Sequence, residues 1–235
     1  MNSRQLTSQG LERKEQLLRA SGRLFAEQGY AATRIADIVK EAGVAKGLFY
    51  WYFENKQAVF RELAAGIRRQ LRATQRMAMD INAPALVRIL QATVASVRFM
   101  AEHASFFSLL EVEGRNVAAD ELRAGTEQHL RDVKRMILDG QTDGTVTRND
   151  ATELMALAVV GAVAQFSHLH RTGRVDMALD DLAGYVARLV ARILAADEDV
   201  ARSSIGQAVP NLHKSHAAKS GDAGANIDAT PAASM

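Results

Sequence analysis

The sequence of 235 residues has no cysteine and only three prolines. The absence of cysteine excludes a disulfide-stabilised scaffold, a zinc finger of the cysteine type and catalysis by a thiol. It also excludes the sensing of a signal through a thiol. Few prolines leave helices uninterrupted, and apolar residues recur with helical periodicity along most of the chain, without a convincing run of strand-like alternation. We therefore predict an all-α protein.

Long hydrophobic runs are scarce as well. The first ten residues are polar, and the longest uncharged apolar stretch, residues 154–166, is too short to span a bilayer. We therefore expect no signal peptide, no membrane partner and a cytoplasmic location.

The motifs of common catalytic sites are also missing. The sequence contains no glycine-rich phosphate loop, no HExxH pair and no spacing of serine, histidine and aspartate that indicates a catalytic triad. His168 and His170 are two residues apart, a spacing that does not place both on one helix face as a shared metal site requires. We predict that the protein is not an enzyme and uses neither a cofactor nor a metal.

The net charge of +2 hides an uneven distribution of charged residues. Residues 1–76 contain 14 basic and 7 acidic side chains, a charge of +7, whereas residues 77–235 contain 15 and 20, a charge of −5. This asymmetry predicts an N-terminal module that meets a polyanion, joined to a larger body that does not. A basic helix face that meets only solvent is the alternative that charge alone leaves open.

Two short helices joined by a tight glycine turn are predicted near the N-terminus. A first helix over residues 11–28 ends at Gly29, because glycine readily adopts the left-handed conformation that closes many helices. A short helix then ends at Gly43, and another follows over residues 45–53. Asn55 is expected to cap the longer helix that comes next.

This is the plan of a three-helix, helix-turn-helix DNA-binding domain over residues 11–72, with the pair itself at about residues 34–53. In such a pair the second helix enters the major groove while the first crosses the phosphate backbone. Side chains at the starts of these helices and on the outer face of the second are therefore candidate DNA contacts. They are Thr33, Arg34, Lys46, Gly47, Leu48, Tyr50, Trp51, Tyr52 and Lys56.

The candidate contacts have the chemistry that DNA recognition requires. Thr33 is the expected N-cap of the first short helix, and Arg34 suits a bidentate contact with guanine. Lys46, Tyr50 and Lys56 suit hydrogen bonds to phosphate oxygens.

The segment LFAEQGYAATRIADIVKEAGVAKGLFYWYFENKQAVF, residues 24–60, resembles the DNA-binding domain of the tetracycline-repressor (TetR/AcrR) family of one-component regulators. It is similar to the family's pattern LFxxxGYxxT, DI, AGVxKGxxYxYF and xKxxL over nearly its whole length. Val39, Ala45 and Leu48 depart from that pattern, and Leu48 suggests an apolar contact such as one with a thymine methyl group. The resemblance covers about the first third of the chain. It implies a two-fold dimer whose last two helices form a four-helix bundle.

The remaining helices are expected to form a larger ligand-binding and dimerisation domain over residues 73–196. The stretch 154–166 is apolar on nearly every side, so one side needs a partner chain unless both sides complete a monomer core. In the last helix, from Ala178 to about Ala195, apolar residues step by four and three as in an interhelical seam. The predicted dimer contacts are Ala158, Gly161, Ala162, Leu182, Val186, Leu189 and Ile193.

A ligand pocket is expected among side chains that interrupt or fill the apolar runs of this domain. The candidates are Arg98, His103, Phe106, His129, Met136, Gln165 and His168, each of which has a hydrogen-bonded or core-filling role as its alternative. Residues 197–235 have almost no periodicity, and we predict a disordered tail there.

Together these features predict a dimeric transcriptional regulator. We expect a repressor that binds a pseudo-palindromic operator and is released when a small, largely apolar effector changes the spacing of its two DNA-binding domains. The alternative is a DNA-binding protein without sequence preference or effector. Competition with random DNA separates the two.

Overall fold

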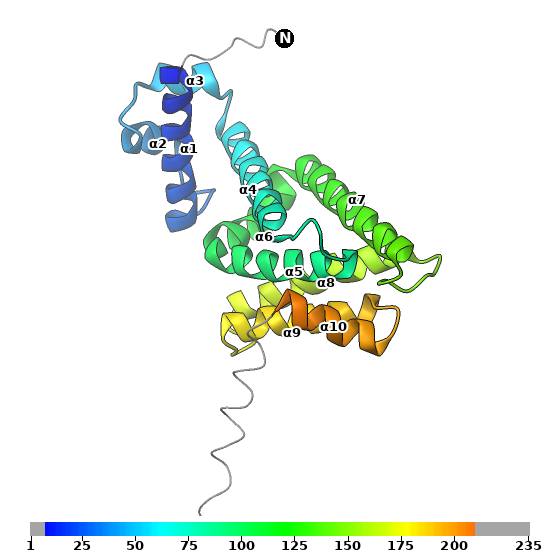
Figure 1. Ribbon diagram of the computed structural model, residues 1–235. Helices are drawn as coiled ribbons and strands as arrows, with labels where there is room; N and C mark the ends of the chain where they lie inside the picture. Colours follow the sequence, from blue (N-terminus) through cyan, green and yellow to red (C-terminus); the bar gives the residue numbers. More distant parts are fainter. Residues whose placement is uncertain (1–7, 210–235) are drawn as a thin grey trace, which may run out of the picture.

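The computed structural model describes residues 8–209, apart from the side chains of residues 115, 116, 121 and 122. Within this range the chain forms ten α-helices and no extended strand (Figure 1), which confirms the all-α prediction. The helices are α1 (Ser8–Gln28), α2 (Ile35–Glu41), α3 (Lys46–Tyr52), α4 (Lys56–Ala78), α5 (Ala85–Glu102), α6 (Ala104–Val117), α7 (Ala119–Asp143), α8 (Thr152–Arg171), α9 (Leu179–Leu194) and α10 (Glu198–Ala208).

Helices α1, α2 and α3 and the first turns of α4 form a small N-terminal head at one end of the molecule (Figure 1). Gly29 and Gly43 have φ angles of 84° and 65°, so both end helices in the left-handed conformation as predicted. Asn55 caps α4 as predicted, because its side-chain oxygen accepts a hydrogen bond of 2.8 Å from the backbone N–H of Ala58. The head is built around largely aromatic core residues: Leu17, Phe25, Ile38, Phe49 and Phe60.

No linker separates the head from the body. The predicted boundary between residues 72 and 73 lies inside α4, which runs for 23 residues from the head into the body (Figure 1). α6 also reaches the head, because its residues Leu109 and Val117 and the next residue, Ala118, pack into the head's core. At the same point the side-chain amide of Gln57 donates a 2.6 Å hydrogen bond to the carbonyl of Val117. Head and body therefore share apolar packing at α6.

Helix α5 is the centre of the body and packs against α4, α7, α8, α9 and α10. Its buried side chains cover most of its circumference, as expected for a helix that is surrounded on several sides. The carboxylate of Asp143 accepts the backbone N–H of Ala85 at 2.8 Å and so satisfies a donor at the start of α5. Burial raises the pKa of Asp143, but hydrogen bonds from Thr145 and Ala85 outweigh it and hold the pKa below its usual value.

The predicted disordered tail is wrong for residues 197–208, which contain α10. Asp197 is the N-cap of this helix, since its carboxylate accepts the backbone N–H of Val200 at 2.8 Å. Glu198 and Asp199 follow in the first turn, where the helix dipole favours negative charge. Ala201 and Ser204 are buried as α10 packs on α5 and α9. The rest of the predicted tail, residues 210–235, lies outside the described residues.

Helix α8 has an unusual composition for a body helix. It is long and apolar enough to cross a membrane, yet only a third of that stretch is buried within the protein. It packs against α5, α7 and α9, as a helix of the bundle does, and its opposite side is exposed. An exposed apolar surface of this kind commonly marks a contact with another molecule.

Candidate DNA-binding surface and body cavity

Helices α2 and α3 form the predicted helix-turn-helix pair, connected by residues 42–45. Gly43 turns the chain, and the backbone N–H of Val44 then donates to the carbonyl of Val39 at 3.0 Å. Ile38 on α2 and Phe49 on α3 are fully buried, and they hold the two helices against the head's core. The opposite side of α3 therefore faces solvent.

The outer face of α3 carries most of the predicted DNA contacts. Lys46 and Gly47 in its first turn are exposed, and Tyr50 and Trp51 have exposed fractions of 51% and 52%. Leu48 and Tyr52 are half-buried at the edges of this face. Phenol and indole groups left half exposed keep a hydrogen-bond donor and an aromatic face free for another molecule. We define this surface, together with exposed Arg34 at the start of α2, as the reading face.

Thr33 does not belong to the reading face. Arg34, not Thr33, is the N-cap residue of α2, and its backbone N–H donates to the carboxylate of Asp37 at 3.0 Å. Only 1% of Thr33 is exposed, and its hydroxyl donates to the carbonyl of Gly29 at 2.8 Å. The predicted capping role of Thr33 is therefore wrong, and its side chain cannot reach DNA because it closes the end of α1.

Lys56 is the second residue that the structure places differently. Its ammonium group points back across the head and donates to the carbonyls of Tyr30, Ala31 and Thr33, the last at 2.8 Å. The same nitrogen lies 4.2 Å from the centre of the Tyr30 ring. Burial lowers the pKa of Lys56, an effect that Glu113 opposes. Because an ammonium has three N–H donors, these bonds leave none for a phosphate.

We predict that Lys56→Ala lowers the free energy of unfolding by about 1–3 kcal/mol, because three carbonyls of the α1–α2 turn lose a charged donor. Urea unfolding measures this loss. Lys40→Ala is the matched control, since Lys40 is an exposed lysine on α2 of the same head. Equal stability of the two variants, with weaker DNA binding only for Lys56→Ala, would instead identify Lys56 as a phosphate contact.

The structure brings together two of the predicted pocket residues, His129 and Met136, in one small cavity that is partly open to solvent. The cavity lies between α4, α5, α7 and α8 and has a volume of about 30 Å³, which is enough for one water molecule. Sequence reasoning missed most of its lining. The residues are Gln75, Ile89, Ala92, Thr93, Ser96, His129, Val133, Met136, Val159, Val160 and Val163.

A signal for part of this lining was present in the sequence. Thr93 and Ser96 are polar residues within an otherwise apolar stretch of α5, and their hydroxyls donate to carbonyls four residues earlier. Such bonds let a hydroxyl face an apolar interior. Gln75 could not be identified in this way, because α4 is polar around most of its length and only packing decides which side faces the body.

Three other predicted pocket residues lie elsewhere, which corrects those assignments. Arg98 is exposed and forms an ion pair of 2.8 Å with Asp180 on α9. The ring of His103 stacks on Phe99, and its Nδ1 is 2.9 Å from the carbonyl of the same residue at the α5–α6 junction. Phe106 packs on the head's core.

Gln165 and His168, on α8, are likewise not pocket residues. Gln165 is exposed. His168 lies at the surface, where its Nδ1 is 3.0 Å from the carboxylate of Glu111 on α6. Arg171 bonds to the other oxygen of that carboxylate, and its Nε donates to Ser108 at 3.2 Å. These residues tie α8 to α6, and we call them the α6–α8 bridge.

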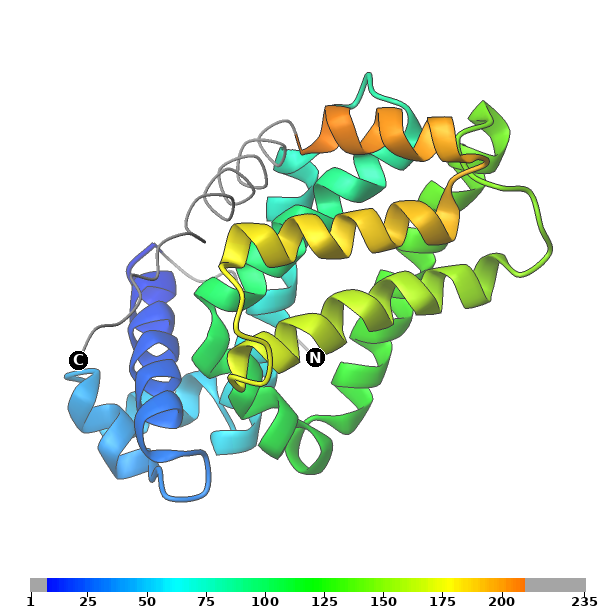
Figure 2. The same cartoon turned by 90° about the horizontal axis from the view of Figure 1, so that it is seen from below.

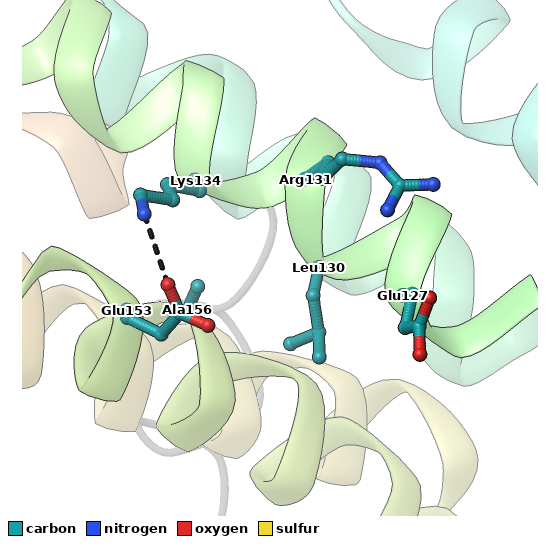
Figure 3. Close-up of a pocket in the computed structure, with 6 residues that line it drawn as sticks. All are labelled: Glu127, Leu130, Arg131, Lys134, Glu153 and Ala156. Carbon is teal, nitrogen blue, oxygen red and sulfur yellow. Dashed lines mark hydrogen bonds and ion pairs between the residues drawn. The ribbon is translucent and has the colours of Figure 1, made fainter. Parts of the chain in front are cut away.

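A groove of about 180 Å³ opens at the surface between α7 and α8 (Figure 3). Leu130 extends from α7 toward α8, with Glu127 on one side of it and Lys134 on the other. An ion pair of 2.9 Å between Lys134 and Glu153 crosses from one helix to the other at the far end (Figure 3). The groove is thus apolar at its floor and charged at its rim.

The predicted dimer contacts fall into two groups. Leu182 and Val186 are fully buried in the body core against α5, so the prediction that they meet a partner is wrong. Ala158 and Gly161 are exposed, whereas Ala162, Leu189 and Ile193 are half-buried. α8 and α9 lie side by side on one face of the molecule (Figure 2).

Larger apolar side chains that sequence reasoning left out extend this face. Leu154, Leu157 and Tyr185 have exposed fractions of 67%, 45% and 43%. With Ala158 and Gly161 they form an apolar surface on α8 and α9 that we call the α8–α9 face.

A family model described as bacterial regulatory proteins of the tetR family matches residues 17–63. An uncharacterized HTH-type transcriptional regulator of Bacillus subtilis (strain 168), YerO, is 48% identical over 48 residues, which cover 20% of this chain and 17% of YerO. The HTH-type transcriptional repressor DhaR of Mycobacterium sp. (strain GP1) is 27% identical over 150 residues, or 61% of this chain and 74% of DhaR.

The fold is also similar to solved structures along most of the chain. A transcriptional regulator of Saccharomonospora viridis, solved in complex with choline, superimposes with a TM-score of 0.66 at 19% identity, over 79% of this chain and 98% of that one. The likeness extends beyond the head to the helical body, although at this identity it concerns the fold alone.

Proposed function

Because the chain belongs to the TetR family of bacterial transcriptional regulators, a family of DNA-binding proteins rather than enzymes, we propose that it is a dimeric repressor released from its operator by a small molecule. The observation that carries this proposal is the reading face. It presents Arg34, Lys46, Tyr50 and Trp51 to solvent from a helix-turn-helix pair held by buried Ile38 and Phe49, in a segment with a net charge of +7. We place this function in the cytoplasm, where the DNA is.

The α8–α9 face supports a dimer. It is apolar, it is exposed, and it lies on the body away from the reading face. A second copy that covers it by two-fold symmetry would bury Leu154, Leu157 and Tyr185 of both chains. Two heads would then be available for the two half-sites of a pseudo-palindromic operator.

Contacts that run from the cavity to the head support control by an effector. α7 and α8 line the cavity, and the α6–α8 bridge joins α8 to Glu111 of α6. At the far end of α6, Gln57 of the head donates to the carbonyl of Val117. An effector that separates α7 from α8 would therefore displace α6 and the head with it. DNA binding would fall because the spacing of the two heads would no longer match the operator.

Competition between an operator and random DNA tests the proposal. The operator is first selected by the full-length protein from a random pool of duplexes. At about 150 mM salt a regulator keeps a preference of at least about 10³ for its site over random DNA. Equal competition would contradict the proposal and identify a DNA-binding protein without sequence preference.

We predict that Arg34→Ala weakens binding to the operator by about 1–3 kcal/mol and relaxes the preference at one base pair. The reason is that an exposed guanidinium at the start of α2 can make a bidentate contact with guanine. Fluorescence anisotropy with the operator and with its single-base variants measures both effects. If the variant weakens every sequence equally, Arg34 binds phosphate and does not read a base.

A further inference from the structure

The cavity between α4, α5, α7 and α8 has one polar end, where Gln75 of α4 is hydrogen-bonded to Ser96 of α5. The side-chain nitrogen of Gln75 donates to the hydroxyl oxygen of Ser96 at 2.8 Å. The Ser96 hydroxyl in turn donates to the carbonyl of Ala92 at 2.6 Å. Among the described residues no donor reaches the side-chain oxygen of Gln75, so an acceptor is left at this end of the cavity.

His129 is the other polar residue at this end of the cavity, and its two ring nitrogens are available for hydrogen bonds. Neither of its ring nitrogens forms a hydrogen bond with the described part of the chain, although the side chain lines the cavity. Burial lowers the pKa of His129, and Arg72 acts in the same direction against Asp132. A neutral imidazole offers one N–H donor and one acceptor nitrogen. Gln75 and His129 are both half-buried, so these atoms reach solvent and can bond to water or to a ligand.

The rest of the cavity is aliphatic and carries no charge. Val133 and Met136 of α7 and Val159, Val160 and Val163 of α8 form its walls, and none of the lining residues is acidic or basic at neutral pH apart from His129. Among these lining side chains a charged ligand group would have no counter-charge in direct contact, which is unfavourable. An aliphatic chain would instead meet surfaces that match it.

We propose that the effector is a compact, uncharged aliphatic molecule with a single hydroxyl or carbonyl group, which hydrogen-bonds to His129 and to the side-chain amide of Gln75. This inference rests on the proposed function, since it takes the cavity as the effector site. The aliphatic part of the molecule lies among the valines of α7 and α8.

The cavity is too small for such a molecule, but the larger groove between α7 and α8 lies beside it. Leu130 and Val133 are one turn apart on α7, as are Ala156 and Val159 on α8, and in each pair the first residue lines the groove and the second lines the cavity. The two hollows therefore lie next to each other along the α7–α8 contact. A molecule that entered the groove and displaced Leu130 would reach His129 by separating α7 from α8.

The test compares four probes that share a six-carbon chain: 1-hexanol, 2-hexanone, hexanoate and hexylammonium. Binding to the full-length protein is measured by calorimetry and by the methyl NMR signals of its valines. We expect the alcohol and the ketone to shift the signals of Val133, Val159 and Val163. Hexanoate and hexylammonium should bind at least about tenfold more weakly, since their charge would be buried without a partner.

Substitutions of His129 test whether this side chain hydrogen-bonds to the ligand. His129→Leu, which removes both ring nitrogens, should weaken 1-hexanol at least about tenfold, a loss of about 1.4 kcal/mol. His129→Gln, which keeps a donor and an acceptor, should restore most of the affinity. His170→Leu is the matched control, because His170 lies outside the cavity and bonds to the carbonyl of Met177.

The outcomes separate this inference from the proposed function. Unchanged binding of 1-hexanol to His129→Leu, or equal binding of a charged probe, would overturn the inference. So would the absence of any shift at the valines, which would mean that the cavity holds water only. If the neutral probes bind through His129 but leave the affinity for the selected operator unchanged, the site is established and the effector role of the cavity fails.

Discussion

Replacement of Gly161 by arginine is expected to produce a monomer that binds operator DNA at least about 100-fold more weakly than the unmodified protein. Gly161 lies on the exposed side of α8, in the middle of the α8–α9 face, where a long cation would be buried against its own symmetry mate. Two heads held together on one operator gain roughly 10²–10⁴ in affinity over separate heads, and this gain is lost in the monomer. Analytical ultracentrifugation and anisotropy measure the two effects.

The chain itself offers a close control for this experiment. A Cβ atom at Gly161 would meet nothing within 4 Å, and the same holds for Gly206 on the exposed side of α10. Both are helical glycines, so arginine should favour the helix by roughly 0.5–1 kcal/mol at either place. Gly206→Arg adds the same charge outside the α8–α9 face and should remain dimeric. A dimeric Gly161→Arg variant with full operator affinity would refute the proposed interface.

The second large effect is expected from Phe49→Ala, which should destabilise the head by about 3–5 kcal/mol and abolish DNA binding. Phe49 is fully buried between α3 and the rest of the head, where its ring lies 5.8 Å from that of Phe53. The only tryptophan of the chain, Trp51, lies on the same helix. Its fluorescence during urea unfolding therefore reports directly on the head.

Tyr50→Ala is the comparison for this variant. Tyr50 follows Phe49 in the sequence but lies on the reading face, with about half of its surface exposed. Its loss should change the free energy of unfolding by only about 0.5 kcal/mol and still weaken binding to DNA. A pair of variants with equal stability would mean that Phe49 is not part of the head's core.

The local geometry of the head followed directly from residue types. Gly29, Gly43 and Asn55 stop or start helices through their own backbone or side chain, so their positions could be predicted without knowledge of the rest of the fold. The directions of Thr33 and Lys56 could not. The Thr33 hydroxyl bonds back to Gly29 instead of forward to the start of α2. Lys56 bonds to carbonyls of the α1–α2 turn that come close to it only when the head is folded.

In the body, too, the sequence did not predict which side of a helix faces the core. α9 has apolar residues on more than one side, and periodicity alone does not say which side meets α5 and which meets a partner. Leu182 and Val186 were therefore predicted to face outward but lie in the core. Similarly, the cavity is lined by residues of four helices, and Gln75 and His129 are 54 positions apart in the sequence.

One feature of α4 links the two ends of the molecule mechanically. Lys56 at its start is bound to the α1–α2 turn, and Gln75 near its end lines the cavity, with no break in the helix between them. At 1.5 Å per residue the two are separated by about 28 Å along a stiff rod. A tilt of about 5° at the cavity would move the head by about 2.5 Å, and hydrogen bonds to base edges do not survive such a displacement. α4 is thus a lever whose short movement at one end is large on the scale of a base contact at the other.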